Sequence, residues 1–394
     1  MSTSYNTYLR RLGASTLIIA FLTCVCSCDK QKADDPLADS GRTQRTENLL
    51  ANLRHQLETG YMFGHHDDTV YGIGWCGDSC RSDVKSVCND YPAVISFDLG
   101  HLELGDSVNL DGVPFDRIRQ EAINQYERGG VVSLSWHLNN PLSEGTSWVA
   151  DSLKDIETKT VEAVLEGGKK HDVMLAWIDK VADFISSLET PYGVKVPVIF
   201  RPWHEHNGSW FWWGQDNCTT DQYKQLWKMT YDRMNEKGVT NALYAYSPGA
   251  GPIKGEAEYM ERYPGDDIVD IMGLDKYCQK APDSTAINDY VTSTQILLSL
   301  LETLAAKHNK VPAFTETGCE GLEAADWWTN CLAESLKDAK IAYVLVWRNA
   351  HDKEGHYFAP YPGQKSAEDF VKFYNDPKTL FAHDINGLYL NKAK

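Results

Sequence analysis

The 394-residue chain has no clustered basic segment and no long apolar run, and each absence excludes a class of protein. Its net charge is −17, whereas recognition of nucleic acid requires Lys and Arg gathered on one surface, so we expect no nucleic-acid partner. The apolar run Leu17–Leu22 is too short to span a bilayer permanently. No Gly-x-Gly-x-x-Gly motif follows the first predicted strand, which argues against a dinucleotide-binding sheet.

The N-terminal residues have the features of an export signal. Arg10 and Arg11 precede the short apolar run, and the segment Val25-Cys-Ser-Cys28 that follows resembles a bacterial lipobox. An ordinary cleaved signal or a short anchor is the alternative. We expect residues 1–27 to be a lipoprotein signal peptide and residues 28–43 a flexible tether. The chain would then be exported and anchored to the outer membrane by a lipid on Cys28, in the periplasm or on the cell surface.

Export also determines how the cysteines are interpreted. Seven cysteines follow Cys28, and in an oxidising compartment they can form disulfides, although the odd number leaves at least one without a partner inside the chain. Cys76, Cys80 and Cys88 are close in sequence, so a disulfide among them would staple one loop. A zinc site is the alternative for these three, but their spacing matches no standard ligand pattern and no His stands among them.

After residue 44 the chain repeats one pattern, in which a short apolar run ends in polar or aromatic residues and a helical stretch follows. Alternating strands and helices indicate a parallel sheet, and eight repeats match a (β/α)8 TIM barrel of the α/β class. A doubly wound open sheet is the alternative. We expect one catalytic domain, residues 44–394, with helices at Gln44–Glu58, Asp221–Lys237, Ile287–Lys307 and Glu323–Lys337. The eight predicted strands are Tyr61–His66, Ala93–Gly100, Val131–His137, Pro197–Glu205, Ala242–Gly249, Ile268–Tyr277, Pro312–Gly318 and Tyr343–Asn349.

Chemically active residues stand at or just past the C-terminal ends of these strands, which all lie on one face of a barrel. They are Asp98, His101, His137, Glu205, Ser247, Asp275, Tyr277, Glu316, Trp347 and Arg348. Glu205 ends the fourth run and Glu316 the seventh, so the two carboxyl groups can face each other across the barrel mouth. Hydrolysis of a glycosidic bond needs such a pair, about 5–5.5 Å apart in a retaining enzyme. The twelve Trp and twenty Tyr fit a carbohydrate site, although core packing is their usual role.

Two motifs carry a resemblance to a known family. Arg-Pro-Trp-His-Glu-His-Asn-Gly-Ser-Trp-Phe-Trp-Trp-Gly at residues 201–214 and Phe-Thr-Glu-Thr-Gly at residues 314–318 resemble the signatures of glycoside hydrolase family 26. This is a barrel family dominated by retaining β-1,4-mannanases. The resemblance implies that Glu205 is the acid/base and Glu316 the nucleophile, with no cofactor. It implies that His137, His204, Trp210 and Tyr277 line the cleft, that Trp347 stacks on the sugar at the cleavage point, and that Arg348 binds the next sugar towards the non-reducing end.

The resemblance also implies the substrate, a β-mannan polysaccharide or manno-oligosaccharide, and we expect a monomeric endo-β-1,4-mannanase with mannobiose as a major product. The alternatives are a mannobiose-releasing exo-enzyme, a β-1,3-xylanase, a mixed-linkage glucanase and a non-catalytic glycan-binding lipoprotein. Long loops at Trp75–Tyr91 and His351–Gln364 are the candidates for closing the cleft. His351 and His356 either contact the distal sugar or lie on the surface.

A metal hydrolase is a further alternative, since His65, His66, Asp67 and Asp68 are consecutive and could combine with His204 and His206. The same segment, Gly64-His-His-Asp-Asp-Thr-Val-Tyr-Gly72, also resembles the end of the first strand in this family, where no metal is needed. We therefore expect no metal.

Overall fold

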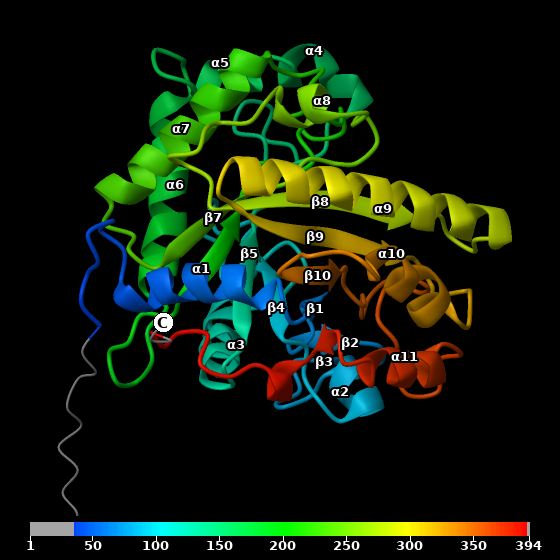
Figure 1. Cartoon of the computed structure of the whole chain (residues 1–394). Coiled ribbons are helices and arrows are strands. Elements are labelled where there is room, and N and C mark those ends of the chain that lie inside the picture. Colours follow the sequence, from blue (N-terminus) through cyan, green and yellow to red (C-terminus); the bar gives the residue numbers. More distant parts are fainter. Residues whose placement is uncertain (1–34, 392–394) are drawn as a thin grey trace, which may run out of the picture.

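Eight parallel strands close into a barrel in the computed structural model, which describes residues 35–391 (Figure 1). β10 pairs with β1, with Phe63 opposite Val344, and this pairing closes the sheet. Closure confirms the predicted (β/α)8 barrel and excludes the open sheet. The barrel strands are β1 (Tyr61–His66), β4 (Val94–Asp98), β5 (Val131–Ser135), β6 (Val198–Arg201), β7 (Ala242–Tyr246), β8 (Ile271–Cys278), β9 (Val311–Cys319) and β10 (Tyr343–Val346).

Three short strands lie outside the barrel proper. β2 (Tyr71–Gly72) and β3 (Trp75–Cys76) form an antiparallel hairpin in the loop after β1. β11 (Thr379–Leu380) pairs with the start of β1. The hairpin therefore stands at the C-terminal face of the barrel, and β11 supports the opposite end of β1.

Helices surround the barrel, and their starts follow the capping rules. α7 begins at a capping box formed by Thr219 and Gln222, and the Asp283 side chain caps the long helix α9, which runs along β8 and β9 (Figure 1). The α-helices are α1 (Gln44–Gln56), α2 (Asp83–Cys88), α3 (Phe115–Glu127), α4 (Lys154–Glu157), α5 (Thr160–Val164), α6 (His171–Ser186), α7 (Thr220–Glu236), α8 (Glu256–Met260), α9 (Ser284–Lys307), α10 (Glu334–Leu336) and α11 (Ala367–Tyr374). Two 3₁₀ turns, η1 (Asp151–Leu153) and η3 (Ala382–Asp384), complete the set.

One predicted helix is wrong in form. The segment Glu323–Lys337 is not a continuous α-helix but a π-helix, η2 (Trp328–Ala333), followed by the single turn α10. Trp327 and Trp328 are consecutive and both fully buried. The π-helix therefore begins directly at this pair of buried side chains.

The hydrophobic core has two parts. The larger part lies between the barrel wall and the surrounding helices. The smaller part fills the barrel interior and is closed at the N-terminal end of the strands by Leu49 and Leu53 of α1 and by Leu388 and Tyr389 near the C-terminus. The N-terminal end of the barrel is therefore sealed, which leaves the C-terminal face as the place for a site.

Contacts with the barrel begin before residue 44, within the segment expected to be a tether. Arg42 forms two hydrogen bonds with Asp270, of 2.9 and 2.7 Å, and the Thr43 side chain caps α1. The predicted signal peptide and Cys28 lie outside the described residues. None of the helices within residues 35–391 has the length and apolarity needed to cross a membrane.

No disulfide links Cys76, Cys80 and Cys88, whose pairing the sequence left open, since all seven cysteines of the described residues have free thiols. Cys76 and Cys80 are exposed, while Cys88 lies in α2 with its thiol directed at the carbonyl groups of Val84 and Asp90.

Candidate active site

Glu205 occupies a strained turn directly after β6. Trp203 and Glu205 both have positive φ angles, 55° and 52°, which are uncommon for residues other than glycine. The Glu205 amide donates a 2.7 Å hydrogen bond to the carbonyl of Ser247, so the turn is tied to the end of β7. Asn207 adds a second tie, because its side chain bonds both the amide and the carbonyl of Gly249. These bonds hold the carboxyl group at the barrel mouth.

The indole of Trp210 positions the Glu205 carboxyl group. Its Nε1 donates a 2.9 Å hydrogen bond to Oε2 of Glu205. The ring lies flat against Gly208, where an added Cβ would overlap it, so glycine is required at that position. Burial raises the pKa of Glu205 well above its usual range, and the charges of Glu316 and Asp275 add to this effect. The site therefore favours the protonated form of Glu205.

Glu316 stands in the opposite environment, surrounded by donors. The Tyr277 hydroxyl donates a 2.7 Å hydrogen bond to its Oε1, and Arg201 donates to its Oε2. Arg201 is 2% exposed and also pairs with Asp275 at 2.8 Å. Its charge stabilises the two carboxylates in a site from which water is largely excluded.

A chain of hydrogen bonds lines the side of the site near β4 and β5. His137 Nδ1 lies 2.6 Å from Oδ2 of Asp98, and His137 Nε2 lies 3.0 Å from Nε2 of His204. Burial disfavours the charged form of His137, but Asp98 outweighs it and raises the His137 pKa. Burial and the neighbouring charges of Arg201 and His137 lower the pKa of His204 well below its usual value. These opposite shifts favour a hydrogen bond that His137 Nε2–H donates to the neutral ring of His204.

Trp347 and Arg348 follow β10. Trp347 stacks on the buried ring of His66, with centroids 4.1 Å apart, which fixes the plane of the indole. Arg348 pairs with Asp111 at 2.7 Å and donates no hydrogen bond to Glu316 among the described residues, so it serves a different part of the site. Its Nη1 also donates to the Tyr71 hydroxyl at 3.2 Å, which ties it to the β2–β3 hairpin.

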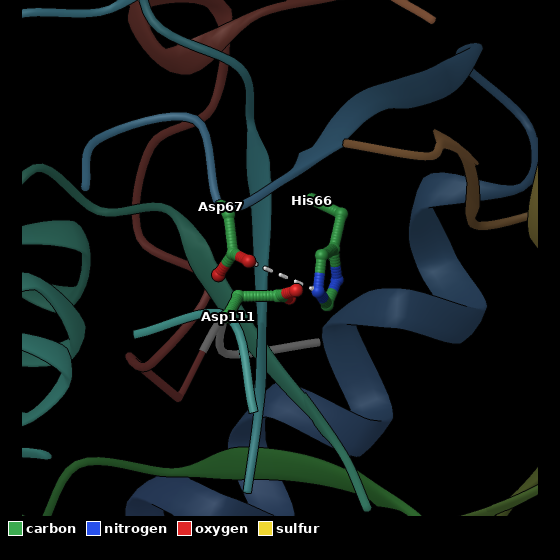
Figure 2. Close-up of side chains that lie close together, drawn as sticks. All are labelled: His66, Asp67 and Asp111. Carbon is green, nitrogen blue, oxygen red and sulfur yellow. Dashed lines mark ion pairs between the residues drawn. The ribbon is translucent and has the colours of Figure 1, made fainter. Parts of the chain in front are cut away.

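His66, Asp67 and Asp111 form a compact cluster beside Arg348, and their side chains converge in Figure 2. Both carboxylates already have protein partners: Asp67 accepts a 2.6 Å hydrogen bond from Tyr71, and Asp111 pairs with Arg348. A cation would have to compete with the Arg348 guanidinium for Asp111. The residues fit a polar wall better than a metal site.

The other residues weighed as metal ligands lie apart from this cluster. His65 bonds Asp68 within the wall of the barrel, at 2.8 Å. His206 is buried between the rings of Tyr223 and Tyr246, below the loop that carries Glu205. His204 belongs to the chain with His137. The six residues therefore do not gather around one point.

A pocket of about 830 Å³ opens from Glu205 on the side of β7 and β8. Trp210 and Tyr277 line its inner end, and Ile296, Leu297 and Leu300 of α9 line its outer end. Arg348 belongs to the opposite side of the site, next to the hairpin after β1. The pocket therefore adjoins Glu205, and Arg348 is not among the residues that line it.

The structure thus brings together the predicted residues Glu205, Glu316, Tyr277 and Trp210 around one point, where Arg201 joins them. His137, His204, Trp347 and Arg348 line the adjoining wall, since the His137 and Trp347 rings are 5.8 Å apart. Of the two loop histidines, His351 contacts the Tyr71 ring, and His356 pairs with Glu320.

Asp111 and Tyr71 are the site residues that sequence reasoning missed. The one available signal was Arg348 itself, because an arginine expected in a cleft needs a counter-ion. The chain has 55 acidic residues, so that signal does not single out Asp111.

Comparisons with known proteins agree with this geometry. The model of glycosyl hydrolase family 26 matches residues 38–313. A solved structure described as a GH26 β-mannanase from Bacteroides ovatus superimposes with a TM-score of 0.85 at 51% identity, covering 90% of this chain and 99% of that one.

Two curated relatives are named mannan endo-1,4-β-mannosidase. The one from Bifidobacterium adolescentis is 30% identical over 99% of this chain, which spans 40% of that relative's length. The one from Bacillus subtilis is 29% identical, covering 78% of this chain and 79% of the relative.

Proposed function

Because the chain belongs to glycosyl hydrolase family 26, we propose that it is a β-1,4-mannanase that cleaves mannan, galactomannan or glucomannan with retention of configuration. The observation that carries the proposal is the contrast between two carboxyl groups. Burial raises the pKa of Glu205 and so favours its protonated form, whereas Glu316 is surrounded by Tyr277 and Arg201 as donors. A retaining glycosidase needs one acid and one nucleophile in such environments.

In the first step, Glu205 gives its proton to the glycosidic oxygen while Glu316 attacks the anomeric carbon. The leaving sugars depart as an alcohol, and a covalent glycosyl ester forms on Glu316. In the second step, the ionised Glu205 takes a proton from water, whose oxygen displaces Glu316. Tyr277 and Arg201 hold the attacking carboxylate in place through both steps.

The surrounding residues supply sugar contacts in this proposal. Trp347, fixed by the stack on His66, offers an apolar face to the sugar that is cleaved. His137 and His204 present polar edges to the sugar that is cleaved. Arg348 donates hydrogen bonds to the next sugar towards the non-reducing end. The pocket beyond Trp210 and Tyr277 accommodates the leaving part of the chain.

We propose endo cleavage with mannobiose as a major product. One observation favours the mannobiose-releasing exo-enzyme as a second candidate. Each predicted closing loop contacts a residue just before the other loop: the His351 and Tyr71 rings are 5.0 Å apart, and Oδ2 of Asp83 accepts a 2.9 Å hydrogen bond from Asn349 Nδ2. A wall at this position would stop a polymer from extending past the second sugar.

Location and assembly are also proposals. The lipobox-like segment supports export and lipid anchoring to the outer membrane through Cys28, in the periplasm or at the cell surface. We propose that the protein acts as a monomer. A β-1,3-xylanase or a mixed-linkage glucanase would use the same carboxyl pair, whereas a non-catalytic glycan-binding protein would not need it.

A reducing-sugar assay tests the proposal. The purified protein is incubated with galactomannan, β-1,3-xylan and mixed-linkage β-glucan, with Glu316→Ala as the inactive control. Mannan cleavage that is lost in the variant supports the proposal. Release of reducing sugar from xylan or glucan, and not from mannan, would assign another substrate. If no polysaccharide releases reducing sugar, the protein is a non-catalytic glycan-binding protein.

A further inference from the structure

Three buried cysteines gather on the outer face of the two strands that carry Tyr277 and Glu316. Cys278 ends β8, Cys319 ends β9, and Cys331 comes from the π-helix η2. The Cys278 thiol lies within hydrogen-bonding reach of both of the other thiols. The cluster takes no part in the site described above, and it is distinct from Cys76, Cys80 and Cys88.

The cluster is separated from the cleft by the strands themselves. Tyr277 points into the barrel mouth, where it contacts Glu316, so its neighbours Lys276 and Cys278 point the other way. Lys276 confirms this direction, because its ammonium group contacts Tyr290 and Thr294 of α9. The thiols therefore lie under α9 and η2, directly behind two residues of the proposed site.

Cys278 and Cys319 are placed as a disulfide requires. They are Cα partners in the register of two neighbouring parallel strands. Such strands are about 4.7–4.9 Å apart, and a disulfide joins Cα atoms about 4.4–6.8 Å apart. The Cα separation of Cys278 and Cys319 therefore lies within the range that a disulfide spans. Cys331 has no such register, since it approaches from a helix.

The surroundings also favour reaction at one of the three sulfurs. Hydrogen bonds from Cys319 and Cys331 lower the pKa of Cys278 to about 4, and the charge of Lys276 contributes. The same contacts raise the pKa of Cys319 and of Cys331. Because the thiolate is the reactive form in thiol–disulfide exchange, the lowered pKa favours Cys278 as the attacking group.

We propose that Cys278 and Cys319 are joined by a disulfide when the chain folds in the presence of a disulfide oxidant, with Cys331 as a neighbouring free thiol. With glutathione disulfide as oxidant, the Cys278 thiolate attacks one sulfur and releases one glutathione. Cys319, after losing its proton, attacks the Cys278 sulfur of the mixed disulfide and releases the second glutathione. Two protein thiols are oxidised and one glutathione disulfide is reduced to two thiols.

The bond would link the ends of β8 and β9 and enclose α9 in the closed loop. A loop of this size restricts the unfolded chain strongly, so the melting temperature should rise by about 5–10 °C. It would also hold the strand ends that carry Tyr277 and Glu316 at a fixed spacing. This consequence does not depend on which polysaccharide is cleaved.

The experiment refolds the purified protein from urea with glutathione disulfide and reduced glutathione, or with reduced glutathione alone. Remaining thiols are then alkylated, and peptides are mapped by mass spectrometry without reduction. We expect the oxidised protein to have two fewer alkylated thiols and to yield a linked pair of peptides containing Cys278 and Cys319. The mapping uses the unmodified chain, so it does not depend on whether a variant folds.

Variants sharpen the assignment. Cys331→Ser and the control Cys218→Ser should keep the linked peptides and the thermal shift, while Cys319→Ser should lose both. Complete alkylation of all three thiols after oxidative refolding would overturn the proposal. So would a bond from Cys278 to Cys331, or retention of one zinc or copper ion by the three thiols in native mass spectrometry.

Discussion

Tyr277 and Glu316 face each other from adjacent strand ends, and the tyrosine hydroxyl donates a 2.7 Å hydrogen bond to Oε1 of the carboxylate. The other oxygen of Glu316 is held by Arg201. Burial and the charge of Glu316 raise the pKa of Tyr277, so the phenol stays protonated and remains a donor. The proposed nucleophile is thus fixed in rotation, because one phenol and one guanidinium each donate to a different one of its oxygens.

Tyr277→Phe should therefore lower kcat on galactomannan. A hydrogen bond to a charged group contributes about 1.5–3 kcal/mol, which corresponds to roughly a 10- to 100-fold loss in rate. Steady-state kinetics measure the effect, with Tyr231→Phe on α7 as a control outside the site. An unchanged kcat in the Tyr277 variant would show that the bond does not orient the nucleophile.

Glu205→Ala should separate natural substrates from activated ones. Cleavage of mannan should nearly cease, because a sugar alcohol cannot leave without a proton. An aryl mannoside with a good leaving group needs no proton, so a burst of phenol should precede a slow steady state. Stopped-flow absorbance measures the burst, with Glu258→Ala as the matched control. An equal loss of cleavage rate on mannan and on the aryl mannoside would show that Glu205 is not the acid/base.

Glu205 should also lower the free energy of unfolding of the protein at neutral pH. Its folded pKa lies above its unfolded value, so the folded state binds the proton more tightly. That contribution is fully present below the unfolded pKa, about 4.3, and is lost as the pH rises through the folded pKa. Glu205→Gln removes the titration. Its melting temperature should match the wild type near pH 4 and exceed it increasingly towards pH 7. An identical difference at both pH values would contradict this linkage.

Much of this arrangement could be predicted from the sequence, because strand ends in a barrel share one face. The eight apolar runs and the positions of Glu205 and Glu316 at two of them were sufficient for the fold and for the carboxyl pair. Those predictions use local patterns alone. The confirmed barrel then places residues that are far apart in sequence at one mouth.

Pairings between loops could not be predicted in the same way. Asp111 and Tyr71 meet Arg348 only through the folding of two separate loops. The aromatic run after Glu205 shows the same limit: Trp210 reaches the carboxyl group, whereas Trp212 and Trp213 are buried in the core. Composition does not distinguish a stacking surface from core packing.

Treatment with EDTA should leave mannan hydrolysis unchanged, since no step of the proposed reaction uses a metal ion. If the activity did depend on a metal ion, the cluster of His66, Asp67 and Asp111 would be the candidate binding site. Its two carboxylates already bind Tyr71 and Arg348. The activity before and after chelation and dialysis is compared. Activity that is lost and then restored by zinc would assign a metal to this cluster.

Arg348 should determine where the polysaccharide is cut. Its guanidinium is held by Asp111 and Tyr71, so its remaining donors are fixed for the hydroxyl groups of a sugar one unit beyond the cleavage point. Binding there anchors a disaccharide on the non-reducing side, which makes mannobiose a major product. Arg348→Ala should raise KM for mannotetraose about tenfold or more and broaden the product distribution. Chromatography of the products measures both effects, with exposed Arg81→Ala as the control.

Analysis of the products, together with viscosity, also distinguishes endo cleavage from exo release of mannobiose. The contact between Tyr71 and His351 lies beside Arg348, where it could close the cleft. If the cleft is open past the second sugar, galactomannan viscosity falls fast and a ladder of oligosaccharides appears. If the contact closes the cleft, mannobiose accumulates alone while the viscosity holds. In the closed case, His351→Gly should remove one side of the wall and shift the products towards longer oligosaccharides, whereas in the open case it should change little. A product ratio that is the same in wild type and Arg348→Ala would show that the anchor lies elsewhere, whichever mode applies.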